Sequence, residues 1–451
     1  MICALVRNFP RKEGAKVNLI VIVSDSLRAD HVGCYGNEWI RTPSLDWLAQ
    51  DSVLFEEAYP EALPTIPVRT SLYTGRRTLT RRGWQPLEPD DVILPEILKE
   101  HGYVTALITD LYHIFKPGMN FHRGYDCFRW IRGQENDHYA NRPPEKSGFD
   151  LDHYLKPEME GSYEWTETRQ YLANMAGRKC EEEYCTPQVI REAEAWLEFN
   201  YDAEKFMLWV DLFDPHEPWD PPPPFNRMYA DPNYQGREII EPMAGPSTYL
   251  EVEELHHIRA LYAGEVTFVD KWIGRLLDKI MELGLFDNTL IVFLSDHGHP
   301  HGERGYMRKN VQPDFPNLHR ELLHIPWLMR FPGGEFGGTR VKQFVQTHDF
   351  LPTVLNVLGI PVPEGVEGRD LMPLIRGEVP EEWPEYIISG RYNRNWCVRT
   401  HDWHLIVTRE QGPVELYNRQ TDPEEMINDI EGYPHIVQDL LRHLRALGID
   451  V

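Results

Sequence analysis

The sequence predicts an α/β fold, in which a large, mixed and mostly parallel sheet is sandwiched by helices and followed by a small C-terminal antiparallel sheet with one helix. Three observations support this prediction. Short apolar runs rich in β-branched residues alternate with segments of helical periodicity. Two of these runs end in acidic residues, at strand ends where ligand sites collect in such sheets. From about residue 383 the pattern changes to short strand-like runs and a last helix.

The first strand is expected at residues 17–23, where an almost unbroken apolar run suits a strand buried on both faces. The run leads into Ser24-Asp25-Ser26, which puts Asp25 at the carboxyl end of that strand. Similar runs predict strands at 104–108, 206–212 and 289–294, and the last leads into Ser295-Asp296-His297-Gly298. Helical periodicity predicts helices at 187–199 and 252–283.

Two long stretches, 132–185 and 217–250, are rich in Pro, Gly, Tyr and charged residues and are expected to be irregular insertions over the sheet. Near the C-terminus, strands are expected at 396–399, 404–407 and 415–417, and a helix at 436–447. A chain of 451 residues fits one large domain with a smaller appendage. We therefore expect a catalytic domain at 1–382 and a C-terminal α+β subdomain at 383–451.

The chain is strongly acidic, with 46 Lys and Arg against 71 Asp and Glu and a formal charge of −25. Such a charge repels nucleic acid and anionic membranes, so neither is expected as a partner. No apolar segment approaches the roughly 18 residues that a membrane span needs. An anionic substrate would have to be held by a few local cations and a metal.

The six cysteines lack a Cys-x-x-Cys pair and are expected to be free thiols in a reducing compartment. Residues 1–16 place an apolar run before the basic residues, which reverses the order of a secretory signal. We therefore expect a cytoplasmic protein.

Side chains that suit a metal ion collect at the expected strand ends. These are Asp25, Thr65, the pair Asp296-His297, and the run from Asp211 to His216. Two carboxylates, an imidazole and a hydroxyl can bind a divalent ion that lowers the pKa of the hydroxyl. The alternative for Asp25 and Asp296 is helix capping, a common role for Asp after a strand. Their occurrence together with the segment around Thr65 favours the metal site.

Seven stretches, in the same order along the chain, resemble the sulfatase family of the alkaline phosphatase superfamily, and the match runs from Val17 to the C-terminus. The stretches are Val23-Ser24-Asp25-Ser26-Leu27-Arg28-Ala29-Asp30 with Gly33-Cys34-Tyr35-Gly36-Asn37, Thr42-Pro43-Ser44-Leu45-Asp46, Pro64-Thr65-Ile66-Pro67-Val68-Arg69 with Thr74-Gly75-Arg76, Asp214-Pro215-His216-Glu217-Pro218, Ser295-Asp296-His297-Gly298 with Lys309 downstream, Asp349-Phe350-Leu351-Pro352-Thr353, and Glu415-Leu416-Tyr417-Asn418. One stretch alone would be weak, but seven in order are a specific match.

The resemblance implies that Asp25, Asp296 and His297 are metal ligands and that the Thr65 hydroxyl completes the coordination sphere. Mn, Zn, Ca and Mg are candidates for the ion, and Ser26, where the family often has a second Asp, weakens the case for calcium. One metal site is expected, because Lys309 resembles the cation that single-metal members use in place of a second ion. Spare ligands for a second ion are Asp211, Asp214, His301 and His348.

The resemblance also implies roles toward the substrate. Arg69 would lie beside the nucleophile and the bound anion. His216 and Lys309 match residues that family members use on substrate oxygens, where they would neutralise charge and protonate the leaving group. His113 is a weaker match to a substrate-binding histidine. Arg304 stands where the family has a histidine, which makes it a further candidate for substrate binding.

Thr65 departs from the family pattern, which has Cys or Ser at this position. A sulfatase oxidises that residue to a formylglycine, whose hydrate attacks sulfur with one hydroxyl and expels sulfate with the other. Threonine cannot supply the second hydroxyl, so a sulfothreonine would stall, whereas attack at phosphorus can resolve a phosphothreonine. We therefore expect a hydrolase of phosphate monoesters, diesters or phosphonate esters that uses Thr65 as its nucleophile.

Two alternatives stay open. One is a sulfatase that tolerates Thr65, through direct attack of water on an aryl or sugar sulfate. The other is a non-catalytic descendant that binds an anion, although the joint presence of a nucleophile, a metal site and cations argues against it. Aromatic residues in the two insertions suit a sugar or aryl group, but they could also cover the sheet or form the contact of a homo-oligomer. The expected partner is a small anionic ester.

Overall fold

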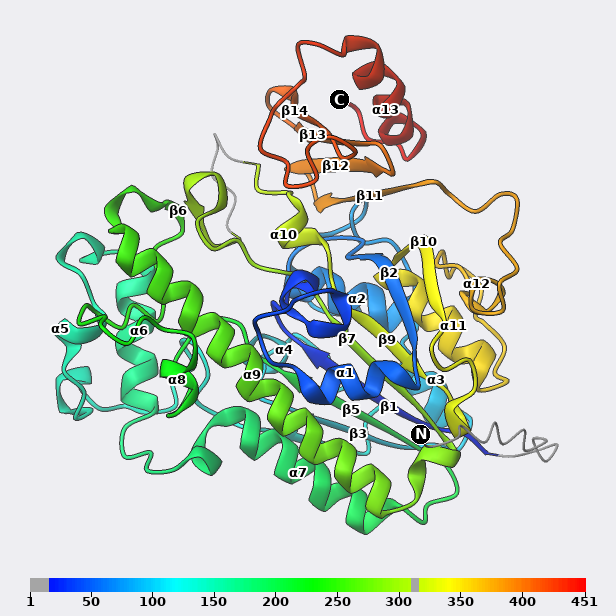
Figure 1. Ribbon diagram of the computed structural model, residues 1–451. Coiled ribbons are helices and arrows are strands. Elements are labelled where there is room, and N and C mark those ends of the chain that lie inside the picture. The colour runs from blue at the N-terminus through cyan, green and yellow to red at the C-terminus, as the bar shows by residue number, and fades with distance from the viewer. Residues whose placement is uncertain (1–15, 310–315) are drawn as a thin grey trace, which may run out of the picture.

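The computed structural model describes residues 16–309 and 316–451, and it confirms the predicted fold class (Figure 1). Eight strands form one sheet in the order β10-β2-β9-β7-β1-β5-β3-β4. Strand β9 is antiparallel to both of its neighbours, and the other pairings are parallel. The strands are β1 (Asn18–Ser24), β2 (Val53–Tyr59), β3 (Val104–Thr109), β4 (Cys127–Trp130), β5 (Phe206–Leu212), β7 (Thr289–Ser295), β9 (Trp327–Arg330) and β10 (Arg340–Gln346).

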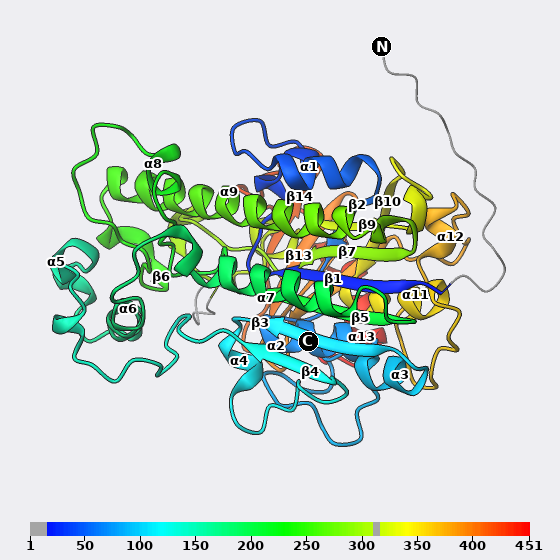
Figure 2. The ribbon, with the colours of Figure 1, turned by 90° about the horizontal axis from the view of Figure 1, so that it is seen from below.

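Helices cover both faces of the sheet, because alternate residues of each strand point to opposite sides. In β1, Ile20 and Ile22 belong to a core under α1 (Pro43–Gln50), α7 (Cys185–Asn200) and α9 (Val252–Glu282). Leu19 and Val21 belong to the opposite core, under α2 (Thr65–Thr74), α3 (Leu94–Glu100), α11 (Phe350–Val357) and α12 (Met372–Ile375). In Figure 2 the long helices α7 and α9 run side by side along the strands.

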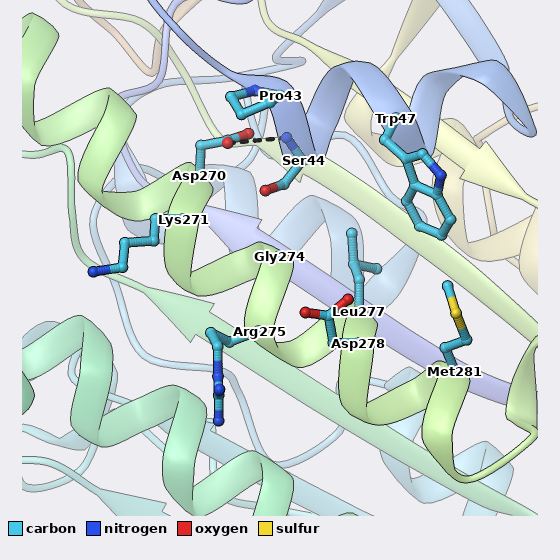
Figure 3. A pocket seen from close by; sticks show the side chains of 10 residues that line it. All are labelled: Pro43, Ser44, Trp47, Asp270, Lys271, Gly274, Arg275, Leu277, Asp278 and Met281. Carbon is cyan, nitrogen blue, oxygen red and sulfur yellow. Dashed lines mark hydrogen bonds between the residues drawn. The ribbon is translucent and has the colours of Figure 1, made fainter.

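Helix α9 also positions α1. The Asp270 carboxylate accepts hydrogen bonds from the backbone N–H groups of Ser44 and Leu45, at 3.0 and 2.8 Å, and so satisfies donors in the first turn of α1. Gly274 permits this close approach, because a Cβ there would lie 2.4 Å from the Ser44 hydroxyl. Beside this contact is a hollow of about 510 Å³ between α1 and α9, with Trp47 and Met281 on its wall (Figure 3). It lies on helices, away from the acidic strand ends.

The C-terminal unit is a four-stranded antiparallel sheet with one helix, as predicted. Its strands, in order across the sheet, are β11 (Tyr386–Arg391), β12 (Asn395–Thr400), β13 (Trp403–Thr408) and β14 (Gly412–Asn418). Helix α13 (Pro434–Ala446) buries Leu440, Leu441 and Leu444 against this sheet. Figure 1 shows the unit, in orange and red, above α10 (Arg320–Leu323). Strand β11 was not predicted, and the domain division at residue 383 stays a prediction.

The two insertions contain more regular structure than expected. The first holds α5 (Leu151–Tyr154) and α6 (Tyr163–Asn174), and the second holds α8 (Phe225–Met228) and β6 (Gly245–Pro246), which pairs with β8 (Tyr306–Met307). Helix α4 (Tyr112–Phe115) follows β3. The start of α6 is fixed by Ser162, whose hydroxyl accepts a hydrogen bond from the N–H of Trp165. This capping signal was hidden in the polar composition of the segment.

Within the two described ranges, no helix has both the length and the apolar character that crossing a bilayer requires. The five cysteines in these ranges, Cys34, Cys127, Cys180, Cys185 and Cys397, are free thiols, as expected. Cys3 and the rest of residues 1–15, on which the expectation about a secretory signal rests, lie outside the described residues.

Candidate active site

The carboxyl ends of β1 and its two neighbours bring the predicted acidic residues together. Ser24 at the end of β1 is in register with Leu212 of β5 and with Ser295 of β7. Asp25 and Asp296, one residue further along their strands, therefore lie side by side. Thr65 begins helix α2, and its hydroxyl lies 3.4 Å from Nε2 of His297. All four side chains are buried.

Asp25, Asp296 and His297 have the geometry that a metal ion needs, and His297 also has the required protonation. Their ligand atoms lie within 4.8 Å of one another, and no other group of three such residues occurs in the described parts of the chain. His297 Nδ1 donates to the Gly298 carbonyl at 2.8 Å, which leaves Nε2 with a free lone pair toward Asp25 and Asp296. Burial lowers the pKa of His297 to about 3, so the imidazole is neutral, the form that binds metals.

The charge balance at this cluster also fits a divalent cation. Arg69 is the cation at its centre: the guanidinium contacts Asp211 at 2.6 and 3.0 Å, Asp296 at 2.6 Å and Asp25 at 3.2 Å. Three buried carboxylates thus face one guanidinium. Burial, together with the negative charge of Asp296, raises the pKa of Asp25 well above its usual value. A divalent ion would offset this excess of negative charge.

Arg69 therefore lies where expected along the chain, but its donors point into the cluster. Besides the three carboxylates, Nη1 donates to the Thr65 carbonyl at 3.3 Å. The guanidinium therefore orients the acidic side chains and the first turn of α2. Asp211, which was considered as a spare metal ligand, is the bidentate partner of Arg69.

Ser26 orients the metal-ligand candidates, a role that was not predicted. Its hydroxyl donates to Asp25 at 2.8 Å, and its N–H donates to Asp296 at 3.0 Å. A left-handed backbone with φ of 62° lets one residue reach both carboxylates. The sequence signal was present only as a departure from the family pattern, where an acidic residue is usual.

His216 and Lys309 form a pair close to the acidic cluster, since the charge of Lys309 acts on both Asp25 and His297. His216 Nδ1 donates to the Glu217 carbonyl at 2.6 Å, so Nε2 is the acceptor that receives a hydrogen bond from Lys309 Nζ. Burial lowers the pKa of His216 well below its usual value, which keeps the imidazole neutral. Lys309 is thus the group of this pair that carries positive charge and a transferable proton.

Glu217, which also contacts His216, links this pair to further charged residues. Glu217 binds Arg308 and lies 2.9 Å from Nε2 of His299. The positive charge of Arg308 holds the pKa of Glu217 well below its usual value, against the opposing effect of burial. Glu217 belongs to a recognised motif, but neither its role nor that of Arg308 was predicted.

His113 lies near this pair and contacts Glu135. Its Nε2 lies 2.8 Å from Glu135, and its ring packs near Phe213, which in turn contacts the ring of His216. Burial alone would raise the pKa of Glu135, but its contact with His113 and the charge of Lys309 lower it to about 2. Glu135 lies in the irregular first insertion, where no sequence signal marked it.

Four other predicted residues lie elsewhere. Arg304 pairs with Glu321 and donates to the carbonyl of Glu424 at 3.2 Å, which ties it to the C-terminal unit. The other spare ligands have partners outside the metal-ligand group. Asp214 accepts hydrogen bonds from Gln134 and Thr186. His301 packs among Trp219, Tyr262 and His299, and His348 lies 3.8 Å from Asp349.

Comparison with known protein families decides the class of the chain. A family model described as "Sulfatase" matches residues 17–360. The chain belongs to the sulfatase family. A second model, described as "N-sulphoglucosamine sulphohydrolase, C-terminal", matches residues 302–449 of this sulfatase-family chain. The chain is therefore a hydrolase that acts on ester bonds, as its sequence predicted.

Similar proteins extend over almost the whole chain. An arylsulfatase from Clostridium perfringens is 27% identical, over 96% of this chain and 94% of its own length. An ulvan-active sulfatase from Formosa agariphila is 28% identical, over 94% of this chain and 78% of its own. The phosphonate monoester hydrolase of Agrobacterium radiobacter has the same fold, with a TM-score of 0.73 and 21% identity, over 96% of this chain and 95% of its own.

Proposed function

We propose that this sulfatase-family chain is a metal-dependent hydrolase of small anionic esters, with a sulfuric ester as the first candidate substrate and a phosphonic or phosphoric ester as the second. The observation that carries this proposal is the buried group of Asp25, Asp296 and His297, with the Thr65 hydroxyl 3.4 Å from His297. The sulfuric ester comes first because both family models and the two sequence relatives named above are sulfatases. This order reverses the expectation from sequence alone, which put phosphorus first.

Thr65 is the specific observation that favours the second candidate. By the resemblance of its segment to the family motif, Thr65 stands where the family has Cys or Ser, and it offers one hydroxyl where a formylglycine hydrate offers two. A hydroxyl at this place can attack phosphorus and be released when water attacks the same phosphorus. The likeness of the fold to a phosphonate monoester hydrolase is compatible with this candidate.

The same residues would bind the ester in either case. A divalent ion held by Asp25, Asp296 and His297 would supply positive charge to the oxyanion and to the attacking oxygen. The first turn of α2 adds its N-terminal N–H groups, which favour an anion. Lys309, held by the neutral His216, neutralises charge on the leaving oxygen and donates a proton to it.

The two candidates differ in what Thr65 does. For a phosphorus ester, the Thr65 oxygen forms a bond to phosphorus while the bond to the leaving oxygen breaks, and water then releases the acid. For a sulfuric ester, water attacks sulfur directly and Thr65 positions the anion. The location in the cytoplasm, the small anionic partner and the lack of nucleic-acid or membrane partners rest on sequence alone and stay proposals, as does a homo-oligomer.

Matched aryl esters test the proposal. Turnover of 4-nitrophenyl sulfate, phosphate and phenylphosphonate should be measured with Mn, Zn, Mg and Ca in turn, and the protein should be examined by mass spectrometry during turnover. Preferred turnover of the sulfate without a covalent adduct supports the first candidate. Preferred turnover of a phosphorus ester with an adduct on Thr65 supports the second. Tight binding of these anions without any turnover would refute both and support an anion-binding descendant.

A further inference from the structure

The hairpin formed by β11 and β12 of the C-terminal unit contacts two segments that carry active-site residues. The Gly390 carbonyl accepts a hydrogen bond from the N–H of Leu63 at 2.8 Å, two residues before Thr65. The next residue, Arg391, donates through Nη2 to the carbonyl of Lys309. Two adjacent residues of one strand therefore hold the segment that leads into α2 and the segment that carries Lys309.

Arg391 is placed to fix backbone rather than to balance a charge. Its Nη1 also donates to the carbonyls of Asn317 and Pro316, at 3.3 and 3.4 Å. Its side chain is buried, and no ion pair joins it to a carboxylate of the described residues. Burial lowers the pKa of Arg391 to about 9. A buried guanidinium is costly, so its contacts with these carbonyls must be maintained.

The backbone next to Lys309 has a fixed conformation, which sets the direction of the Lys309 side chain. Arg308 has a left-handed backbone, with φ of 64°, and its carbonyl accepts from the Asn317 side chain at 2.7 Å. Asn395, paired with Arg391 across the hairpin, donates to the Pro316 carbonyl. Gly390 lets the hairpin strands approach closely, because a Cβ there would lie 2.3 Å from the Asn395 carbonyl oxygen. Hydrogen bonds thus connect the hairpin, Asn317 and Arg308 into one network that supports the backbone at Lys309.

We propose that Arg391 is a positioning residue that holds Lys309 against His216, and that the β11–β12 hairpin is a working part of the active site. This inference rests on the role proposed for Lys309 at the leaving oxygen. Because protonation matters most when the leaving oxygen is basic, loss of this positioning should slow esters of weakly acidic phenols more than esters of strongly acidic ones.

The test compares Arg391→Met with Lys309→Met on aryl esters whose phenols span a range of pKa. For Arg391→Met we expect kcat to fall about 10-fold to 100-fold on the least acidic phenols and much less on 4-nitrophenol, with KM nearly unchanged. The double variant should be no slower than Lys309→Met alone. Arg394→Met is the matched control, since Arg394 carries the same charge and is exposed in the same hairpin turn.

Other outcomes separate this inference from the proposed function. Suppose that Lys309→Met makes kcat depend more steeply on the pKa of the phenol, while Arg391→Met lowers kcat equally for all esters. The positioning role of Arg391 is then refuted, and the proposed role of Lys309 stands. The same conclusion follows if the losses of the two single variants multiply in the double variant. If Lys309→Met leaves that dependence unchanged, both the inference and the proposed role of Lys309 are wrong. Should Arg391→Met fail to fold, Arg391→Lys provides the test. An ammonium reaches fewer of the three carbonyls, so we expect a smaller loss of kcat with the same dependence on the pKa of the phenol.

Discussion

Thr65 is the residue at which the candidate chemistries separate, and its surroundings explain why one hydroxyl matters. It opens a buried helix and lies next to His297, while Arg69 fixes its carbonyl from the next turn. The neighbouring carboxylates are held by Arg69 and Ser26, so protein contacts organise the cluster before any ligand arrives. Pre-organisation of this kind is typical of sites that act on developing charge.

Replacing Thr65 with Val should lower kcat on a phosphorus ester at least about 100-fold, because the side chain keeps its shape and loses the hydroxyl that attacks phosphorus. Thr65→Ser should stay within about tenfold of the wild-type rate, since it keeps the oxygen. Steady-state kinetics on the best aryl ester, with circular dichroism to confirm folding, measures both. Wild-type turnover by the valine variant would mean that the hydroxyl has no part in the reaction.

Among the elements, helix α1 depends on α9 for its first turn. Thr42, the residue before α1, makes no side-chain capping hydrogen bond to the helix. Asp270 of α9 instead accepts hydrogen bonds from two N–H groups in the first turn of α1. Helix α1 has only eight residues, so packing and this contact have to hold it in place.

The substitution Asp270→Ala should lower the free energy of unfolding by about 1–2 kcal/mol, because the N–H groups of Ser44 and Leu45 lose their acceptor. Urea unfolding measures this loss. Asp278→Ala is the control, since Asp278 is exposed two turns further along the same helix and should change stability by less than about 0.5 kcal/mol. Equal losses in the two variants would show that the contact with α1 is not what Asp270 contributes. Ester turnover should be unchanged in both.

At the scale of the whole molecule, buried charge networks join the C-terminal unit to the catalytic sheet. His404 of β13 lies 2.9 Å from Glu425 and from Arg399 of β12, and Arg399 donates to the hydroxyl of Tyr59 in β2. Burial lowers the pKa of His404 to about 4, so its imidazole is neutral in the folded protein at neutral pH.

Stability should fall as the pH drops from about 6.5 to about 4, because in this range His404 is protonated in the unfolded protein but stays neutral in the folded protein. The contribution of this residue is about 3 kcal/mol, fully present above pH 6.5 and lost toward pH 4. Urea unfolding of the wild type and of His404→Gln at pH 7 and pH 5 isolates it from other groups. The variant should lose less stability than the wild type on acidification. Parallel losses would contradict this assignment.

The fold could be predicted where burial leaves a continuous apolar run. The expected strand at 206–212 coincides with β5, and the expected helix at 252–283 is one residue longer than α9. Strand β2 was missed because Glu56 and Glu57 interrupt its apolar pattern, and β4 because its side chains are partly exposed. These strands lie toward the sides of the sheet, where one-sided or partial burial weakens the pattern.

The candidate site could be predicted where a motif follows a strand, as for Asp25, Asp296 and His297. Ser26, Glu135 and Arg391 were missed for different reasons. Glu135 and Arg391 act through contacts with residues distant in sequence, such as Arg391 with Lys309, and neither lies in a pattern whose spacing predicts the contact. Ser26 lies in a family motif, but it differs from the usual acidic residue there, so the motif predicted no role for it. Arg304 shows the converse, because the chain near it resembles the family while its side chain turns to the C-terminal unit.

The central claim is that Asp25, Asp296 and His297, together with Thr65, form a metal centre at which an ester is hydrolysed. The most direct measurement is turnover of aryl sulfate, phosphate and phosphonate esters by metal-stripped protein, before and after addition of each divalent ion, for the wild type and for Asp296→Asn. We expect turnover of at least one ester that depends on the ion and falls at least about 100-fold in the variant. Equal turnover by the two proteins, or no ion-dependent turnover of any ester, would contradict it.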